Sequence, residues 1–131
     1  FAFGSEEEDH PFRPHTYPEL CVAYTGTHDN DTTKGWYEAL SELEKHRVRA
    51  YLSSPDADIV EHMIEALFRS RARLVLLPAQ DLWELDGAHR MNTPATTDGN
   101  WSWRMTLEEL HDTARFEALG ELTRQTGREV T

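Results

Sequence analysis

The sequence predicts an α/β fold in which parallel strands alternate with helices. Two short apolar runs, residues 21–25 and 74–77, are typical of strands, and helical patterns fill most of the segment between them. Another helical pattern follows the second run after a long loop. Strands joined through helices lie parallel in right-handed crossovers, so this order of elements indicates the α/β class.

Each predicted strand ends at a clear break in the sequence. The first run ends at Gly26, before a polar segment, and the second run ends at Pro78. The second run is apolar on both faces, which is typical of a strand in a sheet that is covered on both sides. Because two or three parallel strands do not complete a sheet, we expect the chain to belong to a larger barrel or to cover its strand edges by association.

The helices are predicted from capping signals and apolar spacing. Asp31 is the expected N-cap of the first helix, and Ser41 with Glu44 has the spacing of a capping box for the second. An apolar stripe at helical spacing marks the third, and Thr106 with Glu109 forms a second capping box. The helices are expected at residues 32–40, 41–52, 57–70 and 106–125.

Composition narrows the functional classes. The 131 residues carry 24 Asp or Glu against 13 Lys or Arg, and the formal net charge of −11 argues against partners such as nucleic acid or an anionic membrane surface. The longest apolar runs are far shorter than the ~20 residues of a membrane-spanning helix. Cys21 is the single cysteine, which favours a reducing compartment, and we expect the cytoplasm.

Polar side chains gather in the segments that follow the strands. Residues 27–31 follow the first strand, and Gln80, Asp81 and the loop 86–103 follow the second. The residues at 1–3 look like the end of a further strand. Function in parallel α/β folds gathers at the carboxyl ends of strands, so we expect these segments to face the same side.

The cluster His28-Asp29-Asn30-Asp31 supports three interpretations. Its short carboxylates and imidazole suit hydrogen bonds to vicinal sugar hydroxyls, or His28, Asp29 and Asp31 could be metal ligands. It could also be a polar turn in which Asp31 caps the next helix. The metal interpretation is the weakest, because the sequence has no partner motif such as HExxH.

The long loop offers further candidates. Asn92 is suited to contact substrate hydroxyls, whereas Trp101 and Trp103 could either face sugar rings or cover an edge of the core. For these tryptophans, and for Arg90 and Arg104 as residues that tie the loop down, we favour structural roles.

With these residues in view, the chain resembles the C-terminal part of the catalytic barrel of amylomaltases, the 4-α-glucanotransferases. The matching blocks occur in the order of the family across nearly the whole chain. They are Phe1-Ala2-Phe3-Gly4, Pro14-His15, Tyr24-Thr25-Gly26-Thr27-His28-Asp29-Asn30-Asp31-Thr32-Thr33, Gly35-Trp36-Tyr37, Gln80-Asp81, Arg90-Met91-Asn92 with Pro94, and Gly99-Asn100-Trp101-Ser102-Trp103-Arg104.

The resemblance implies a single partial domain over residues 1–131, formed by the last two to three strands of a (β/α)₈ TIM barrel. It also implies a retaining transferase, without metal or cofactor, that moves segments of α-1,4-glucan between maltooligosaccharides through a covalent glucosyl-enzyme. Asp29 matches the carboxylate that stabilises the transition state, and His28 and Asn92 match contacts to the sugar. Phe1 matches an aromatic residue on the acceptor side, and Ala95 stands where the family usually carries Gly.

The family's nucleophile and acid/base carboxylates belong to earlier strands, upstream of Phe1. The chain also begins without an initiator Met. We therefore expect a piece of a longer enzyme that is inactive alone and needs the rest of the barrel as its partner. The alternative is a glucan-binding or assembly module without catalysis, and the gene upstream of Phe1 would separate the two.

Overall fold

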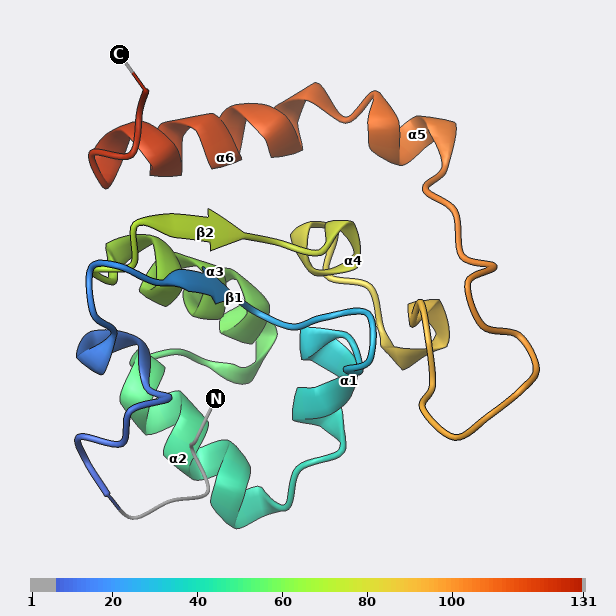
Figure 1. Cartoon of the computed structure of the whole chain (residues 1–131), viewed down its shortest axis with the longest axis horizontal. Helices are drawn as coiled ribbons and strands as arrows, with labels where there is room; N and C mark the ends of the chain where they lie inside the picture. The colour runs from blue at the N-terminus through green and yellow to red at the C-terminus, as the bar shows by residue number, and fades with distance from the viewer. Residues whose placement is uncertain (1–6, 131) are drawn as a thin grey trace.

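The computed structural model describes residues 7–130, so the predicted site residue Phe1 and the strand end at 1–3 lie outside the described part. Figure 1 shows the path of the chain. The elements are η1 (Pro14–Thr16), β1 (Val22–Tyr24), α1 (Thr33–Glu38), α2 (Glu42–Leu52), η2 (Asp56–Asp58), α3 (Ile59–Arg69), β2 (Leu74–Leu76), α4 (Ala79–Leu82), η3 (Gly87–His89), α5 (Leu107–Leu110) and α6 (Thr113–Gln125). None of the helices between residues 7 and 130 has the length and apolar character needed to cross a membrane.

The two predicted strands form one parallel pair. Val22 lies opposite Leu74, and Tyr24 lies opposite Leu76. Three α-helices, α1, α2 and α3, and the short η2 lie between the strands, and both strands run in the same direction in Figure 1. The predicted α/β class with parallel strands is therefore confirmed.

Residues 7–130 cover only one face of the strand pair. Ala23 is buried with Leu67 of α3 and Ala72, whereas the side chains next to it in β1 are about half exposed. Successive side chains of a strand point to opposite faces, and residues 7–130 provide a helix for only one of them. The uncovered sheet face consists of Val22, Tyr24, Leu74 and Leu76.

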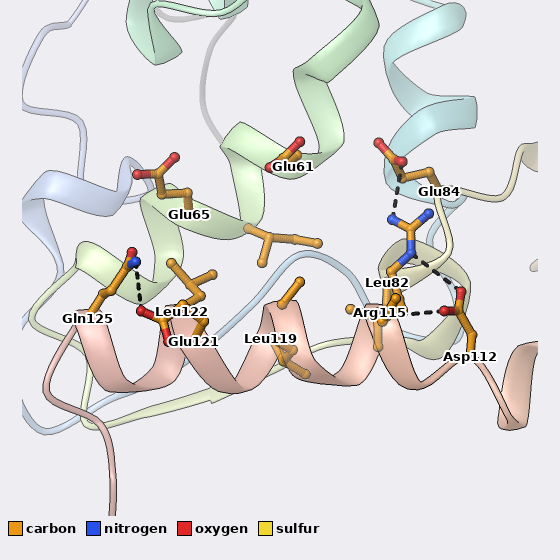
Figure 2. Close-up of a pocket in the computed structure, with 13 residues that line it drawn as sticks. Glu61, Glu65, Leu82, Glu84, Asp112, Arg115, Leu119, Glu121, Leu122 and Gln125 are labelled. Carbon is orange, nitrogen blue, oxygen red and sulfur yellow. Dashed lines mark hydrogen bonds and ion pairs between the residues drawn. The ribbon is translucent and has the colours of Figure 1, made fainter.

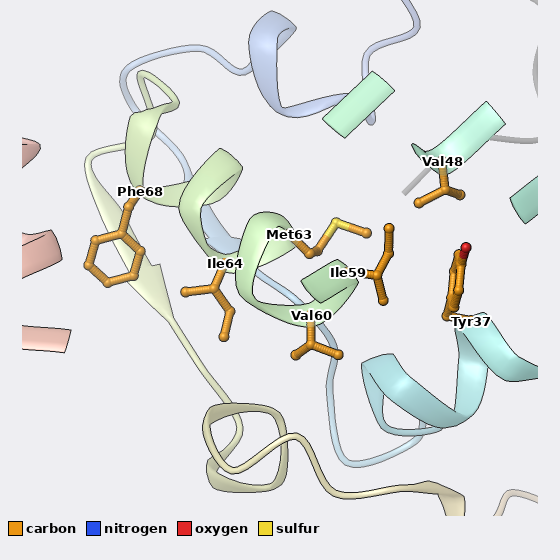
Figure 3. Packing of buried hydrophobic residues seen from close by; sticks show 7 residues of the cluster. All are labelled: Tyr37, Val48, Ile59, Val60, Met63, Ile64 and Phe68. Atoms are coloured by element: carbon orange, nitrogen blue, oxygen red, sulfur yellow. The ribbon is translucent and has the colours of Figure 1, made fainter. Parts of the chain in front are cut away.

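The core lies around α3, as its apolar stripe predicted. Figure 3 shows Met63 and Ile59 of α3 directed toward Val48 of α2 and Tyr37 of α1. All four are buried, and Met63 and Val48 are completely inaccessible to solvent. α3 thus packs against both the preceding helices and the sheet, on which the loops after β1 and β2 are carried.

The first predicted helix begins one residue later than expected. Thr32, and not Asp31, is the N-cap of α1, because the Thr32 hydroxyl accepts a hydrogen bond from the Gly35 amide at 3.1 Å. The Asp31 carboxylate accepts instead from the Thr32 amide at 2.8 Å. Both residue types cap helices well, so the sequence alone did not separate the two adjacent positions.

Both predicted capping boxes are present, at Ser41 with Glu44 and at Thr106 with Glu109. The last predicted helix, however, is divided into α5 and α6. Asp112 interrupts it, because its carboxylate accepts from the Arg115 amide at 3.1 Å and caps a new helix.

Candidate functional site

Two loops meet beyond the carboxyl ends of the strands. The first, residues 26–32, leaves β1, and the second follows η3 and carries Arg90, Asn92 and Trp101. Together with α4 they enclose a cavity of about 270 Å³. Its lining residues are Gly26, Thr27, His28, Asn30, Asp31, Thr32, Pro78, Gln80, Asp81, Arg90, Met91 and Trp101.

Asp29 is the residue at which the two loops are joined. Asn92 Nδ2 donates to Asp29 Oδ1 at 2.7 Å, across 63 residues of sequence, and Arg90 Nη2 donates to the Asp29 carbonyl at 3.1 Å. His28 Nε2 lies 3.4 Å from Asp29 Oδ2. The structure therefore brings together His28, Asp29 and Asn92, and the side chains of the first two remain half exposed.

A tight turn presents His28 and Asp29 at the tip of the first loop. Asn30 Oδ1 accepts from the Thr27 amide at 2.8 Å and from the Thr27 hydroxyl at 3.0 Å. The Asn30 amide donates back to the Thr27 carbonyl at 3.1 Å. Such side-chain bonds to neighbouring backbone are typical of Asn in turns. Asn30 therefore shapes the loop, while the two residues inside the turn stay accessible.

Trp101 belongs to the site and does not cover the core as expected. Its ring lies 5.0 Å from the His28 ring, tilted by 39°, and it is 55% exposed. Its backbone has φ +60°, and its amide donates to the Met91 carbonyl at 2.7 Å. A left-handed conformation is uncommon for a bulky residue, and here it turns the tryptophan toward His28.

The prediction that Arg90 and Arg104 hold the loop in place is confirmed by their hydrogen bonds to loop carbonyls. Arg104 donates to the carbonyls of Trp101, at 3.0 Å, and Trp103, at 2.8 Å. Arg90 Nε donates to the Asn92 carbonyl at 3.3 Å, in addition to its bond to the Asp29 carbonyl.

The second loop is anchored through η3. The Asp86 carboxylate accepts from the Ala88 amide at 3.1 Å and lies 3.0 Å from His89 Nδ1. The hydrogen bond with His89, followed by that from Ala88, lowers the pKa of the Asp86 carboxyl below its ordinary value. The His89 carbonyl accepts from Gln80 Nε2 at 3.2 Å, which ties η3 to α4.

The geometry suits hydrogen bonding to a polyhydroxylated ligand. The site presents two carboxylate oxygens, an imidazole, an amide and the face of an indole within one small region. Within residues 7–130 no group of three or more His, Cys, Asp or Glu side chains is placed to hold a metal ion. The carboxylate, amide and aromatic groups are those that bind and orient sugars.

A larger cavity, of about 600 Å³, lies between α3, α4 and α6 (Figure 2). Leu82, Leu119 and Leu122 contribute to its apolar part. Arg115 lies 3.4 Å from Glu84 in an ion pair at its edge. None of the site residues predicted from the sequence lines this cavity.

The chain is similar in sequence to 4-alpha-glucanotransferases. A sequence model of the family described as 4-alpha-glucanotransferase matches residues 1–115. The chloroplastic/amyloplastic 4-alpha-glucanotransferase of Solanum tuberosum is 44% identical over 119 residues, which cover 90% of this chain and 20% of that protein. The 4-alpha-glucanotransferase of Thermus thermophilus is 39% identical, over 94% of this chain and 26% of that protein.

The fold of the chain is also similar to that of a solved structure. The amylomaltase from Streptococcus agalactiae in complex with acarbose superposes with a TM-score of 0.83 at 36% identity, over 89% of this chain and 24% of that one. The chain thus spans about a fifth to a quarter of the length of these relatives. On the match of the family model and the agreement in structure, the chain belongs to the 4-alpha-glucanotransferase family.

Proposed function

We propose that this chain supplies the transition-state-stabilising part of a retaining 4-α-glucanotransferase. The observation that carries the proposal is the hydrogen bond from Asn92 Nδ2 to Asp29 Oδ1, which joins two distant segments at one exposed carboxylate. Its position beyond the carboxyl ends of parallel strands is where barrel enzymes bind substrate. The substrate is an α-1,4-glucan or maltooligosaccharide, and the acarbose named with the Streptococcus agalactiae amylomaltase supports this class.

Asp29 acts on the sugar next to the bond that is cleaved. Its carboxylate accepts hydrogen bonds from ring hydroxyls, and these bonds strengthen as the ring flattens toward an oxocarbenium ion. His28 contacts neighbouring hydroxyls, while Asn92 holds the carboxylate in place and offers its own polar contact. Binding that is stronger in the transition state than in the ground state raises kcat rather than lowering KM.

The remaining chemistry requires the rest of the barrel. A retaining mechanism needs a nucleophilic carboxylate and an acid/base carboxyl about 5 Å apart, and we assign neither to this chain. The uncovered sheet face supports such a partner, because four apolar side chains lie where further strands of a barrel would enclose them. The chain alone is therefore inactive in this proposal.

A non-catalytic glucan-binding or assembly module is the alternative. The same half-exposed His28 and Asp29 would then bind glucan without cleaving it. Cys21 is a free cysteine, which supports a reducing compartment such as the cytoplasm. The Solanum tuberosum relative is named as a chloroplastic/amyloplastic protein.

Incubation with maltotriose tests the proposal. The full-length protein that carries this chain is expected to produce glucose together with longer maltodextrins, and the 131-residue chain is expected to produce neither. Glucan binding by the full-length protein without transfer would establish the module instead. Transfer by the isolated chain would overturn the assignment of nucleophile and acid/base to other segments.

A further inference from the structure

Asp81 is a buried carboxylate to which the catalytic proposal assigns no role. It lies in α4, directly after β2, and is 2% exposed. Its Oδ1 accepts from the Thr33 amide at 2.7 Å and its Oδ2 accepts from the Thr33 hydroxyl at 2.8 Å. The Thr25 hydroxyl donates to the same Oδ2 in a short hydrogen bond.

These three hydrogen bonds reach both ends of one loop. Thr25 follows the last residue of β1, and Thr33 is the first residue of α1. The segment between them, residues 26–32, is the loop that carries His28 and Asp29. A single carboxylate therefore fixes the point at which this loop leaves the sheet and the point at which it enters the helix.

The cost of burying this carboxylate indicates that the arrangement is specific. A buried carboxylate is strongly destabilising unless hydrogen bonds or a cation satisfy it. Within residues 7–130, Asp81 has no cationic side chain within ion-pair distance, and its hydrogen bonds go to the two loop ends. The neighbouring Gln80 holds the other wall of the site through the His89 carbonyl, at 3.2 Å.

We propose that Asp81 is a positioning residue that holds the loop of His28 and Asp29 in its catalytic geometry by binding Thr25 and Thr33. This inference rests on the proposed function, because it concerns the same Asp29. Although Asp81 borders the site cavity, both of its carboxylate oxygens are engaged by Thr25 and Thr33. Asp81 acts through the loop, and a displacement of about 1 Å at a reacting centre lowers rates by about 10²-fold.

The experiment compares three variants of the full-length protein. Asp81→Ala removes all three hydrogen bonds, Asp81→Asn keeps an acceptor for the Thr33 amide, and Thr25→Val removes one bond with little change of shape. Ser54→Ala is the matched control, because Ser54 is also buried and hydrogen-bonded, to His62 at 2.5 Å, but lies between α2 and α3. For each, kcat and KM on maltotriose are measured per folded molecule, with amide exchange of residues 27–31.

We expect kcat to fall about 100-fold in Asp81→Ala and about 10-fold in Thr25→Val, with Asp81→Asn between them. KM should change less than about 3-fold in each, because ground-state contacts persist. Amide exchange in the loop should accelerate about 10-fold or more in Asp81→Ala, and Ser54→Ala should change neither kcat nor loop exchange. In the double variant the losses of Asp81→Ala and Thr25→Val should not add, since Asp81→Ala already removes the bond that Thr25→Val removes.

Unchanged kcat and unchanged loop exchange in Asp81→Asn and Thr25→Val would overturn the proposal even if Asp81→Ala fails to fold. If the wild-type protein transfers no glucan, the proposed function fails, but loop exchange still decides whether Asp81 holds the loop. Faster exchange in Thr25→Val supports that role, and unchanged exchange removes it.

Discussion

Asp31 occupies a space that two glycines leave open. A Cβ atom at Gly35 would lie 2.6 Å from Asp31 Oδ1, and one at Gly87 would lie 3.0 Å from the same oxygen. The carboxylate is thus held between α1 and η3, at the base of the loop that carries Asp29. A side chain at either glycine would push Asp31, and with it the loop.

Two glycine-to-alanine exchanges should therefore have opposite effects on stability. Gly35→Ala is expected to lower the free energy of unfolding by about 1–3 kcal/mol, because the clash outweighs the helix propensity of alanine. Gly120→Ala in α6 is expected to raise it by about 0.5–1 kcal/mol, since the nearest atom to its Cβ is Arg124 Nη1, at 3.7 Å. Denaturant unfolding of both variants measures this, and a stabilising Gly35→Ala would contradict it.

For individual residues, the sequence predicted which side chains form the site but not every residue that lies against them. His28, Asp29 and Asn92 were found from residue type and motif, and the structure places them together. For Trp101 the favoured expectation, that it covers the core, was wrong, because its orientation depends on a positive φ that no local pattern near a tryptophan signals. Ala95 also has a positive φ, of 62°, a conformation that favours glycine over alanine.

A polar cluster joins α1, α2 and η2 at the edge of the core. The Tyr37 hydroxyl forms a short hydrogen bond to Asp56, and Arg49 lies 2.7 Å from Asp56 Oδ1 and 3.1 Å from the Tyr37 hydroxyl. The bonds from Tyr37 and Arg49 lower the pKa of the Asp56 carboxyl, and burial raises the pKa of Tyr37. The cluster therefore stabilises the packing of these elements while Asp56 is ionised.

This cluster gives a pH dependence with a defined sign. The folded-state pKa of Asp56 lies below its ordinary value of 3.8, so its contribution is complete above that pH and is lost as the pH falls through the folded-state pKa. Asp56→Asn should melt at a lower temperature than wild type at neutral pH, and the difference should close below pH 3.8. Thermal melting across this range measures it, and a difference independent of pH would contradict the assignment.

The elements were predictable where their signals are local. Both capping boxes lie within four residues of sequence and were located correctly, as was the apolar stripe of α3. The division of the last helix was not predicted. The Asp112 side chain caps α6 and so ends the helical run before it, and the sequence pattern alone did not show that this cap forms. Gly127, with φ +68°, ends α6 close to the expected position.

On the scale of the whole molecule, the uncovered sheet face is the most informative feature. Leu74 and Leu76 of β2 lie beside Val22 and Tyr24 of β1, and all four are about half exposed. Apolar side chains on a strand are stabilising only when another layer buries them. The full-length protein is expected to supply that layer.

Charged substitutions on this face test that expectation. In the full-length protein Leu76→Glu should lower the free energy of unfolding by about 2 kcal/mol or more, because the leucine becomes buried there. Leu43→Glu is the control, since Leu43 is exposed on α2, and its effect should stay within about 0.5 kcal/mol. Equal, small effects at both positions would show that the sheet face remains in solvent.

The order of elements predicted that the strands pair in parallel, but it did not predict which faces of the strands other elements cover. The apolar run at 74–77 indicated burial on both faces, and residues 7–130 bury only one. The barrel came from the resemblance, because two strands determine neither the number of strands nor the closure of a sheet.

The kinetics of Asp29→Asn in the full-length protein test whether Asp29 stabilises the transition state of glucan transfer. Asp98→Asn, an exposed residue of the second loop, is the matched control. We predict that Asp29→Asn lowers kcat on maltotriose by about 10²–10³-fold with a much smaller change in KM, and that Asp98→Asn changes neither. A near-normal kcat in Asp29→Asn would show that Asp29 does not stabilise the transition state.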